Sequence, residues 1–131
     1  MLQRFVAGSL VASVLVPCAT LIVVVTPGLG PQRAYPLTTL WCFVPALWGL
    51  WAVIMPNAWF PRRLPLWGAI LGLALGQFAA FVLNVPHAVF GVDVSPLVRG
   101  LAGVIIAGLY YLLWMLVRLV NRHLVPSPSV T

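Results

Sequence analysis

Apolar positions along the chain form four long continuous blocks, and most polar positions lie in the short segments between them. The blocks cover about residues 5–26, 37–55, 65–85 and 96–119, each close to the roughly 20 apolar residues that a helix needs to cross a bilayer. Their apolar character is continuous, whereas the strands of a membrane barrel alternate between apolar and polar residues. The pattern therefore predicts four membrane-spanning helices.

Prolines mark the limits of these blocks. The first three are each followed by a proline, namely Pro27, Pro56 and Pro86. The fourth begins at Ser95-Pro96, where serine suits the N-cap and proline suits the first helical position. Two further prolines, Pro17 and Pro45, lie inside the first two blocks and predict kinks there, because proline removes a helical hydrogen bond.

Composition supports a lipid environment. Of the 131 residues, 63% are hydrophobic and 6% are charged, against about 25% charged in a soluble domain. We therefore expect an all-α integral membrane four-helix bundle with antiparallel neighbours, formed by residues 1–131 as one transmembrane domain, with a disordered tail at 124–131. The apolar stretch of the first block exceeds the usual 7–15 residues of a signal peptide, and no A-x-A site follows it, which favours a retained helix.

The arginines predict the orientation in the membrane. With four crossings, Arg4, the second loop and the end of the last block share one side, which then holds five arginines. The other side holds Arg33 and Arg99, together with Asp93, the one acidic residue of the chain. The positive-inside rule therefore places both termini in the cytoplasm of a bacterial-type inner membrane.

The formal net charge of +6 does not indicate nucleic-acid binding, because the arginines flank the spans and form no stripe. Besides setting the topology, a rim of arginines on the cytoplasmic side would attract anionic lipid head groups; its members are Arg62, Arg63, Arg118 and Arg122. The tryptophans divide into Trp41, Trp59 and Trp67, expected near the membrane interfaces, and Trp48 and Trp51, expected to pack between helices.

Small residues recur every four positions in the third block. This glycine row consists of Gly68, Gly72, Gly76 and Ala80. Because lipid provides no hydrophobic drive for helix association, such a row predicts close packing against another helix. The fourth and first helices both offer small residues as partners within the chain, and a face between copies in a homo-oligomer is the alternative.

Polar side chains gather toward the predicted outer side. Gln77 and Asn84 are seven residues apart, which places them on one helical face that should point into the bundle. His87, Asp93 and Arg99 follow close behind. The structural interpretation is that Asp93 pairs with Arg99 or caps the last helix, while the amides tie helices together. The functional interpretation is a small ligand-binding cluster of all five residues.

Several kinds of chemistry lack the residues that they need. The two histidines, His87 and His123, are predicted on opposite sides of the membrane, so no metal site and no haem or other cofactor is expected. One Asp and no Glu exclude a pair of catalytic carboxylates within one chain. Cys18 and Cys42 are isolated, without a C-x-x-C motif. We therefore expect no enzyme.

Two families of comparable size fit poorly. Small multidrug exporters carry a glutamate in their first helix, and the trimeric glutathione-dependent membrane enzymes carry charges in their second; this chain has neither. The leading hypothesis is a small multi-pass membrane protein without its own catalysis, acting by helix packing with itself, a larger membrane complex or lipid. The alternative is binding or transport of a small neutral or anionic ligand through the outer polar cluster.

Overall fold

The described part of the chain, in a computed structural model, is residues 1–26 and 39–124, without the side chains of 89 and 90, and its regular structure is entirely helical. Three helices are long and apolar enough to cross a membrane. They are α1 (Leu2–Val25), the continuous helix Leu64–Val82 made of α4 (Leu64–Gln77) and η1 (Phe78–Val82), and α6 (Pro96–Leu124). The expectation of an all-α membrane protein agrees with this architecture.

The second predicted helix is shorter than expected. An apolar helical segment, Thr39–Val53, is interrupted by a turn at Cys42 and Phe43, and the regular helix α3 covers Val44–Val53. Pro45 lies in the first turn of α3, so it begins a helix instead of kinking one. Residues 37 and 38 lie outside the described residues, and the fourth crossing stays a prediction.

The other boundaries also shift. The third helix ends at Val82 instead of 85, while α6 continues to Leu124, five residues beyond the predicted end. The predicted tail therefore loses Leu124 to α6, and its remainder at 125–131 lies outside the described residues, as do Pro27 and Arg33. Proline stands in the first turn of α4 and of the short helix α5 (Val85–Phe90), where its missing N–H costs no helical hydrogen bond.

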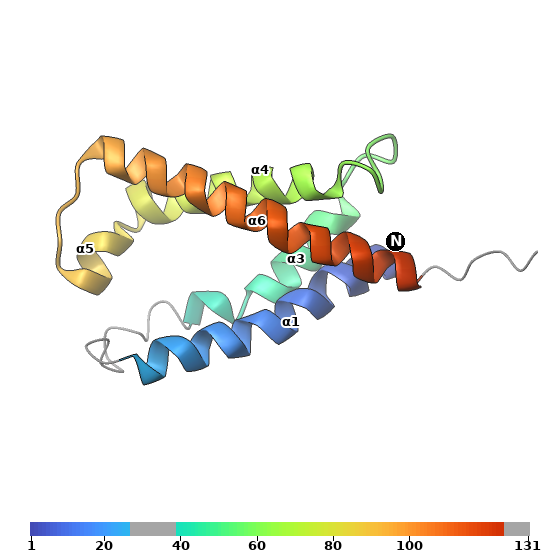
Figure 1. Cartoon of the computed structure of the whole chain (residues 1–131), viewed down its shortest axis with the longest axis horizontal. Helices are drawn as coiled ribbons and strands as arrows, with labels where there is room; N and C mark the ends of the chain where they lie inside the picture. Colours follow the sequence, from blue (N-terminus) through green and yellow to red (C-terminus); the bar gives the residue numbers. More distant parts are fainter. Residues whose placement is uncertain (27–38, 125–131) are drawn as a thin grey trace, which may run out of the picture.

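The helices associate as two pairs, α1 with α3 and α4 with α6, and α1 also touches α6. Figure 1 shows the pairs crossing near the N-terminus and diverging toward the end that carries α5. The beginning of α1 and the end of α6 meet, because the side chain of Gln3 donates a hydrogen bond to the Leu124 carbonyl (3.4 Å). The first residues and Leu124 therefore lie at the same end of the molecule.

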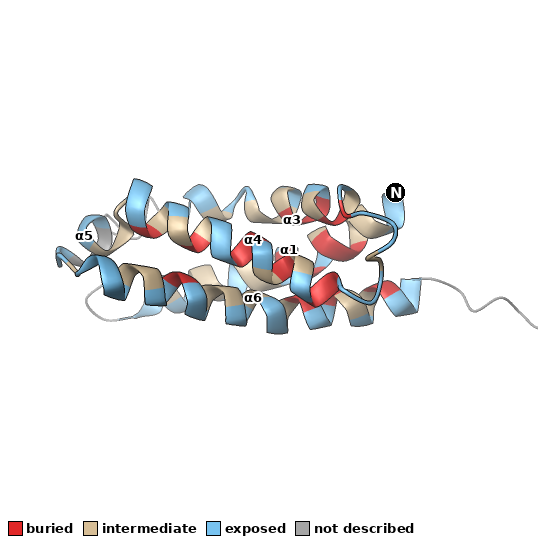
Figure 2. Cartoon of the chain, turned by 90° about the horizontal axis from the view of Figure 1, so that it is seen from above, coloured by how far each residue is buried: buried red, intermediate tan, exposed pale blue. Residues whose placement is uncertain are grey.

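Buried residues concentrate at that end, which we call the core end and define as residues 1–12, 48–72 and 110–124. Figure 2 shows them gathering toward the N-terminus, with others along the contact of α4 with α6. In α1 the buried residues are confined to Ala7, Gly8, Val11 and Ala12. Beyond them, Val14, Leu21 and Val25 are each more than half exposed. We call the opposite end, residues 13–26 and 78–100, the α5 end.

Aromatic rings form the centre of the core end. Trp114 of α6 is fully buried, and its ring centroid lies 5.5 Å from that of Trp48 in α3, which also meets Tyr110 edge-on at 5.3 Å. Trp51 of α3 and Trp67 of α4 stack at 4.8 Å. These contacts join three helices, and we call them the aromatic cluster.

Candidate functional site

The predicted polar cluster begins where α4 changes its winding. In η1 the Leu83 N–H donates to the Phe78 carbonyl, five residues back (3.1 Å), instead of the residue four back. This π turn inserts an extra residue per turn and changes which side chains share a face. The seven-residue spacing of Gln77 and Asn84 consequently does not place them on one helical face, which corrects the expectation from the sequence.

Gln77 serves the contact between α4 and α6. Its Nε2 donates a hydrogen bond to the Gly100 carbonyl of α6 (3.3 Å). The side chain lies against Gly103, where a Cβ atom would overlap the Gln77 amide. Gln77 therefore fills space between two helices, and the bare backbone of Gly103 is what admits it.

Asn84 lies between the long helix and α5. Its φ of 46° is left-handed, a conformation that asparagine tolerates better than most residues, and its carbonyl accepts the Ala88 N–H (2.9 Å). Its Oδ1 atom is buried and has no hydrogen-bond partner among the described residues. The residue therefore separates the long helix from α5 and is the N-cap of α5.

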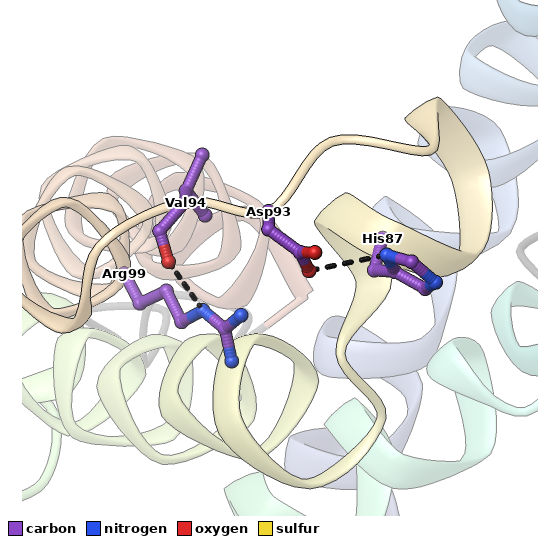
Figure 3. A network of polar contacts seen from close by, with 4 residues as sticks. All are labelled: His87, Asp93, Val94 and Arg99. Carbon is purple, nitrogen blue, oxygen red and sulfur yellow. Dashed lines mark hydrogen bonds and ion pairs between the residues drawn. The ribbon is translucent and has the colours of Figure 1, made fainter.

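His87 and Asp93 pair with each other, as Figure 3 shows. The Nδ1 atom of His87 is 3.1 Å from Oδ1 of Asp93, and the two side chains are 57% and 78% exposed. Arg99 turns away, and its Nε donates to the Val94 carbonyl (3.1 Å). The predicted pairing of Asp93 with Arg99 is therefore wrong, because histidine lies nearer to the carboxylate.

The five residues predicted as a cluster make separate contacts. Gln77 bonds the backbone of α6, Arg99 bonds its own loop, and the His87–Asp93 pair is exposed. Two surface hollows of about 410 and 420 Å³ lie elsewhere, one beside Arg4 and the other beside Leu21 and Val25. Among the described residues, no group of three or more His, Cys, Asp and Glu side chains is placed to hold a metal ion.

The glycine row of α4 lies against α6. A Cβ atom at Gly68 would overlap the Trp114 ring, one at Gly72 would lie 2.5 Å from Tyr110 Cβ, and one at Gly76 would lie 3.1 Å from the Cα of Gly103. Ala80, the last member of the row, is buried. The row therefore brings α4 close enough for two large aromatic side chains of α6 to cover its backbone.

Glycines also allow close packing of α1 against α3. A Cβ atom at Gly8 of α1 would lie 2.7 Å from the Trp48 carbonyl oxygen of α3, and one at Gly49 would lie 2.6 Å from Ser9 Oγ. Each helix thus presents a glycine to the other. The first helix, which the sequence offered as a second candidate partner for the glycine row, packs on α3 through its own glycine instead.

Sequence reasoning missed the bonding of the tryptophans. Trp51 Nε1 donates to the Trp67 carbonyl (2.9 Å), and Trp67 Nε1 donates to the Trp51 carbonyl (2.8 Å). Trp59 adds an edge contact to Trp67 at 5.9 Å. Trp67 was predicted to anchor at the membrane surface, but it links α3 to α4. One feature of the sequence pointed to this contact, since Trp51 and Trp67 both lie within about one helical turn of the loop that joins α3 to α4.

The predicted head-group arginines lie at the core end. Arg62 and Arg63 are exposed in the loop before α4, with the Arg63 guanidinium 5.3 Å from the Trp59 ring centroid. Arg118 and Arg122 lie in the last two turns of α6, and the Nε atom of Arg118 is buried without a partner among the described residues. Arg4, which was not in the predicted set, lies beside the same loop.

Comparisons with models of protein families, with curated proteins and with solved structures find no match for this chain.

Proposed function

We propose that this chain is an integral membrane protein without catalysis of its own, which acts by packing its helices against other membrane components. The observation that carries the proposal is the contrast between its polar and apolar side chains. Within the long helices, the Gln77 amide and the Trp67 indole donate hydrogen bonds to backbone carbonyls of neighbouring helices. The large apolar side chains of α1 and α6 point outward instead, as at Ile22, Ile105 and Leu112.

Such a surface suits contact with lipid chains or with another membrane helix, since both are apolar. The partners that fit are a second copy of the chain, a larger membrane complex and the lipid itself. In this proposal the segment Thr39–Val53 supplies the fourth crossing, and both termini face the cytoplasm of the cell membrane. The arginine distribution supports this orientation, because five of the seven lie at the core end.

Two measurements test the proposal. Single cysteines at positions 62 and 93, in a background without Cys18 and Cys42, should react with an impermeant maleimide from opposite sides of sealed vesicles, with position 62 protected from outside. The protein should remain in the membrane after carbonate washing. Labelling of both positions from one side would contradict four crossings, and release by carbonate would contradict an integral protein.

Assembly is measured on the same preparation. Crosslinking in vesicles, followed by mass determination in mild detergent, should give a defined species larger than the monomer. A strictly monomeric chain that also retains no lipid would contradict action by association. The ligand-binding alternative stays a prediction, with Gln77 and Arg99 bonded to backbone carbonyls and the His87–Asp93 pair exposed.

A further inference from the structure

The positive charges at the core end have no acidic side chain near them in the sequence or among the described residues. The guanidinium groups there belong to Arg4, Arg62, Arg63, Arg118 and Arg122. The chain contains one acidic side chain, Asp93, which pairs with His87 at the α5 end. The 29 residues of α6 separate the two ends by about 40 Å. Because no side chain of the same protein can balance these charges, anions from outside must do so.

Arg4 is the best oriented of these groups. One terminal nitrogen donates to the Met55 carbonyl (3.3 Å), and the other donates to Asn57 Oδ1 (2.9 Å). The guanidinium carbon lies 3.9 Å from the centre of the Phe60 ring. All three partners are neutral, so they hold the group in place without cancelling its charge. An arginine has five N–H donors, which leaves three for another acceptor.

An open surface hollow of about 410 Å³ lies beside this guanidinium. Its lining combines the polar side chains of Arg4 and Asn57 with the apolar side chains of Met1, Val53, Met55 and Pro56. Arginine binds phosphate through parallel N–H donors with a defined geometry. The hollow therefore offers both a phosphate ligand and an apolar surface next to it.

The surroundings favour a lipid over a free phosphate. The hollow is lined by residues at the start of α1, at the end of α3 and in the loop before α4. The same two helices expose large apolar side chains, among them Leu2, Leu10 and Leu50. A phospholipid could place its phosphate at Arg4 and its acyl chains along these residues. The loop arginines would add a long-range attraction for an anionic lipid.

We propose that the core end binds an anionic phospholipid, with Arg4 as the phosphate ligand and Arg62 and Arg63 as supporting charges. This inference names one partner of the proposed membrane protein and rests on that function. It differs from a general attraction of basic residues to membranes because it assigns one oriented guanidinium and one hollow.

The test measures lipid retention by native mass spectrometry of the full chain, purified from vesicles of equal parts phosphatidylglycerol and phosphatidylcholine. The wild type should retain phosphatidylglycerol preferentially. Arg4→Gln should lower that preference about fivefold, the change expected when one arginine contact of about 1 kcal/mol is lost. Arg99→Gln is the matched control, since it removes an arginine at the α5 end, and it should change the preference less than about 1.5-fold.

Three results would overturn the assignment. They are an unchanged preference in Arg4→Gln, an equal loss in Arg99→Gln, and complete competition by millimolar glycerol phosphate, which would assign the site to a soluble phosphate. Near-ultraviolet circular dichroism of the aromatic cluster reports whether each variant is folded. If Arg4→Gln unfolds, Asn57→Ala is the second variant, because it removes one of the two acceptors that orient Arg4. It should lower the preference at least twofold, and no change there would overturn the assignment.

Failure of this lipid site and failure of the proposed function give different results. A chain that stays membrane-embedded and assembles, yet shows no preference for phosphatidylglycerol, would overturn only the lipid site. A chain released by carbonate would overturn the membrane assignment itself.

Discussion

The two ends of this molecule are built from similar residues and organised in different ways. At the core end, Trp48, Trp114 and Val117 are almost fully buried where three helices meet. At the α5 end, Ile22 and Val82 are each 66% exposed, and the polar pair His87–Asp93 is exposed as well. Both ends are rich in apolar residues, so hydrophobicity does not explain the difference.

The distance between helix backbones explains this difference in burial better than hydrophobicity does. In lipid, an apolar side chain gains little by moving from acyl chains to a protein interior, so helices associate through close packing and hydrogen bonds. Gly8 and Gly49 bring α1 to α3, and Gly68 and Gly72 bring α4 to α6, all at the core end. Along α6, by contrast, a Cβ atom at Gly108 would meet nothing within 4 Å. Position relative to a neighbour, and not residue type, decides what a glycine contributes.

The largest effect should come from filling the closest contact. Gly68→Leu places a side chain where the Trp114 ring lies, and the ring has no space to move because it is fully buried. We expect a loss of at least about 3 kcal/mol in the free energy of unfolding, at the upper end of overpacking effects. Unfolding by sodium dodecyl sulfate in mixed micelles measures it.

Gly108→Leu is the control, since the same substitution there meets open space on the same pair of helices. It should change the free energy of unfolding by less than about 0.5 kcal/mol in the monomer, as surface substitutions do. Equal effects of the two substitutions would show that glycine position does not distinguish the two surfaces.

A smaller effect is expected from the reciprocal tryptophan bonds. Trp67→Phe keeps an aromatic ring to stack on Trp51 but removes the N–H that donates to the Trp51 carbonyl. A side-chain hydrogen bond between membrane helices is worth about 0.6–1.7 kcal/mol, so a loss near 1 kcal/mol is expected in the same assay. Trp59→Phe, in the same cluster, is the control, and an equal loss there would indicate that ring size matters and the bond does not.

The sequence predicted the fold because apolar length and proline position are local properties. The ends of α1 and the start of α6 followed from these signals within a few residues. The sequence did not predict the turn at Cys42 and Phe43 that interrupts the second helix. An apolar block has the same pattern whether its helix is continuous or interrupted. The π turn at Phe78–Val82 was also hidden, since its sequence, FAAFV, contains no helix-breaking residue.

The candidate site was less predictable for the same reason. Assigning Gln77 and Asn84 to one face required a regular helix between them, and the π turn removes that condition. The bond from Gln77 to Gly100 depends on the crossing of α4 and α6, which no local pattern encodes. The contacts of Arg4 were not predicted because its partners, Met55 and Asn57, are about 50 residues away in the chain.

A modest effect should follow removal of the Gln77 amide. Gln77→Met has a similar volume, so it should keep the contact with Gly103 and lose the bond to the Gly100 carbonyl. The expected loss is about 0.6 kcal/mol, the average for such bonds in a membrane protein. A loss above about 2 kcal/mol would indicate that the amide does more than join two helices.

The smallest effect should be found at the α5 end, where the exposed His87–Asp93 pair offers the sharpest contrast with the core. A double-mutant cycle of His87→Gln and Asp93→Asn measures the coupling energy of the pair. We expect less than about 0.5 kcal/mol, because both side chains are more than half exposed and water screens their interaction. One molar salt should remove most of the charge contribution, since the screening length then falls to about 3 Å. A coupling above about 1.5 kcal/mol that survives this salt would require the pair to be shielded from water. The α5 end would then be covered in the assembled protein, and the contrast between the two ends would hold for the isolated chain alone.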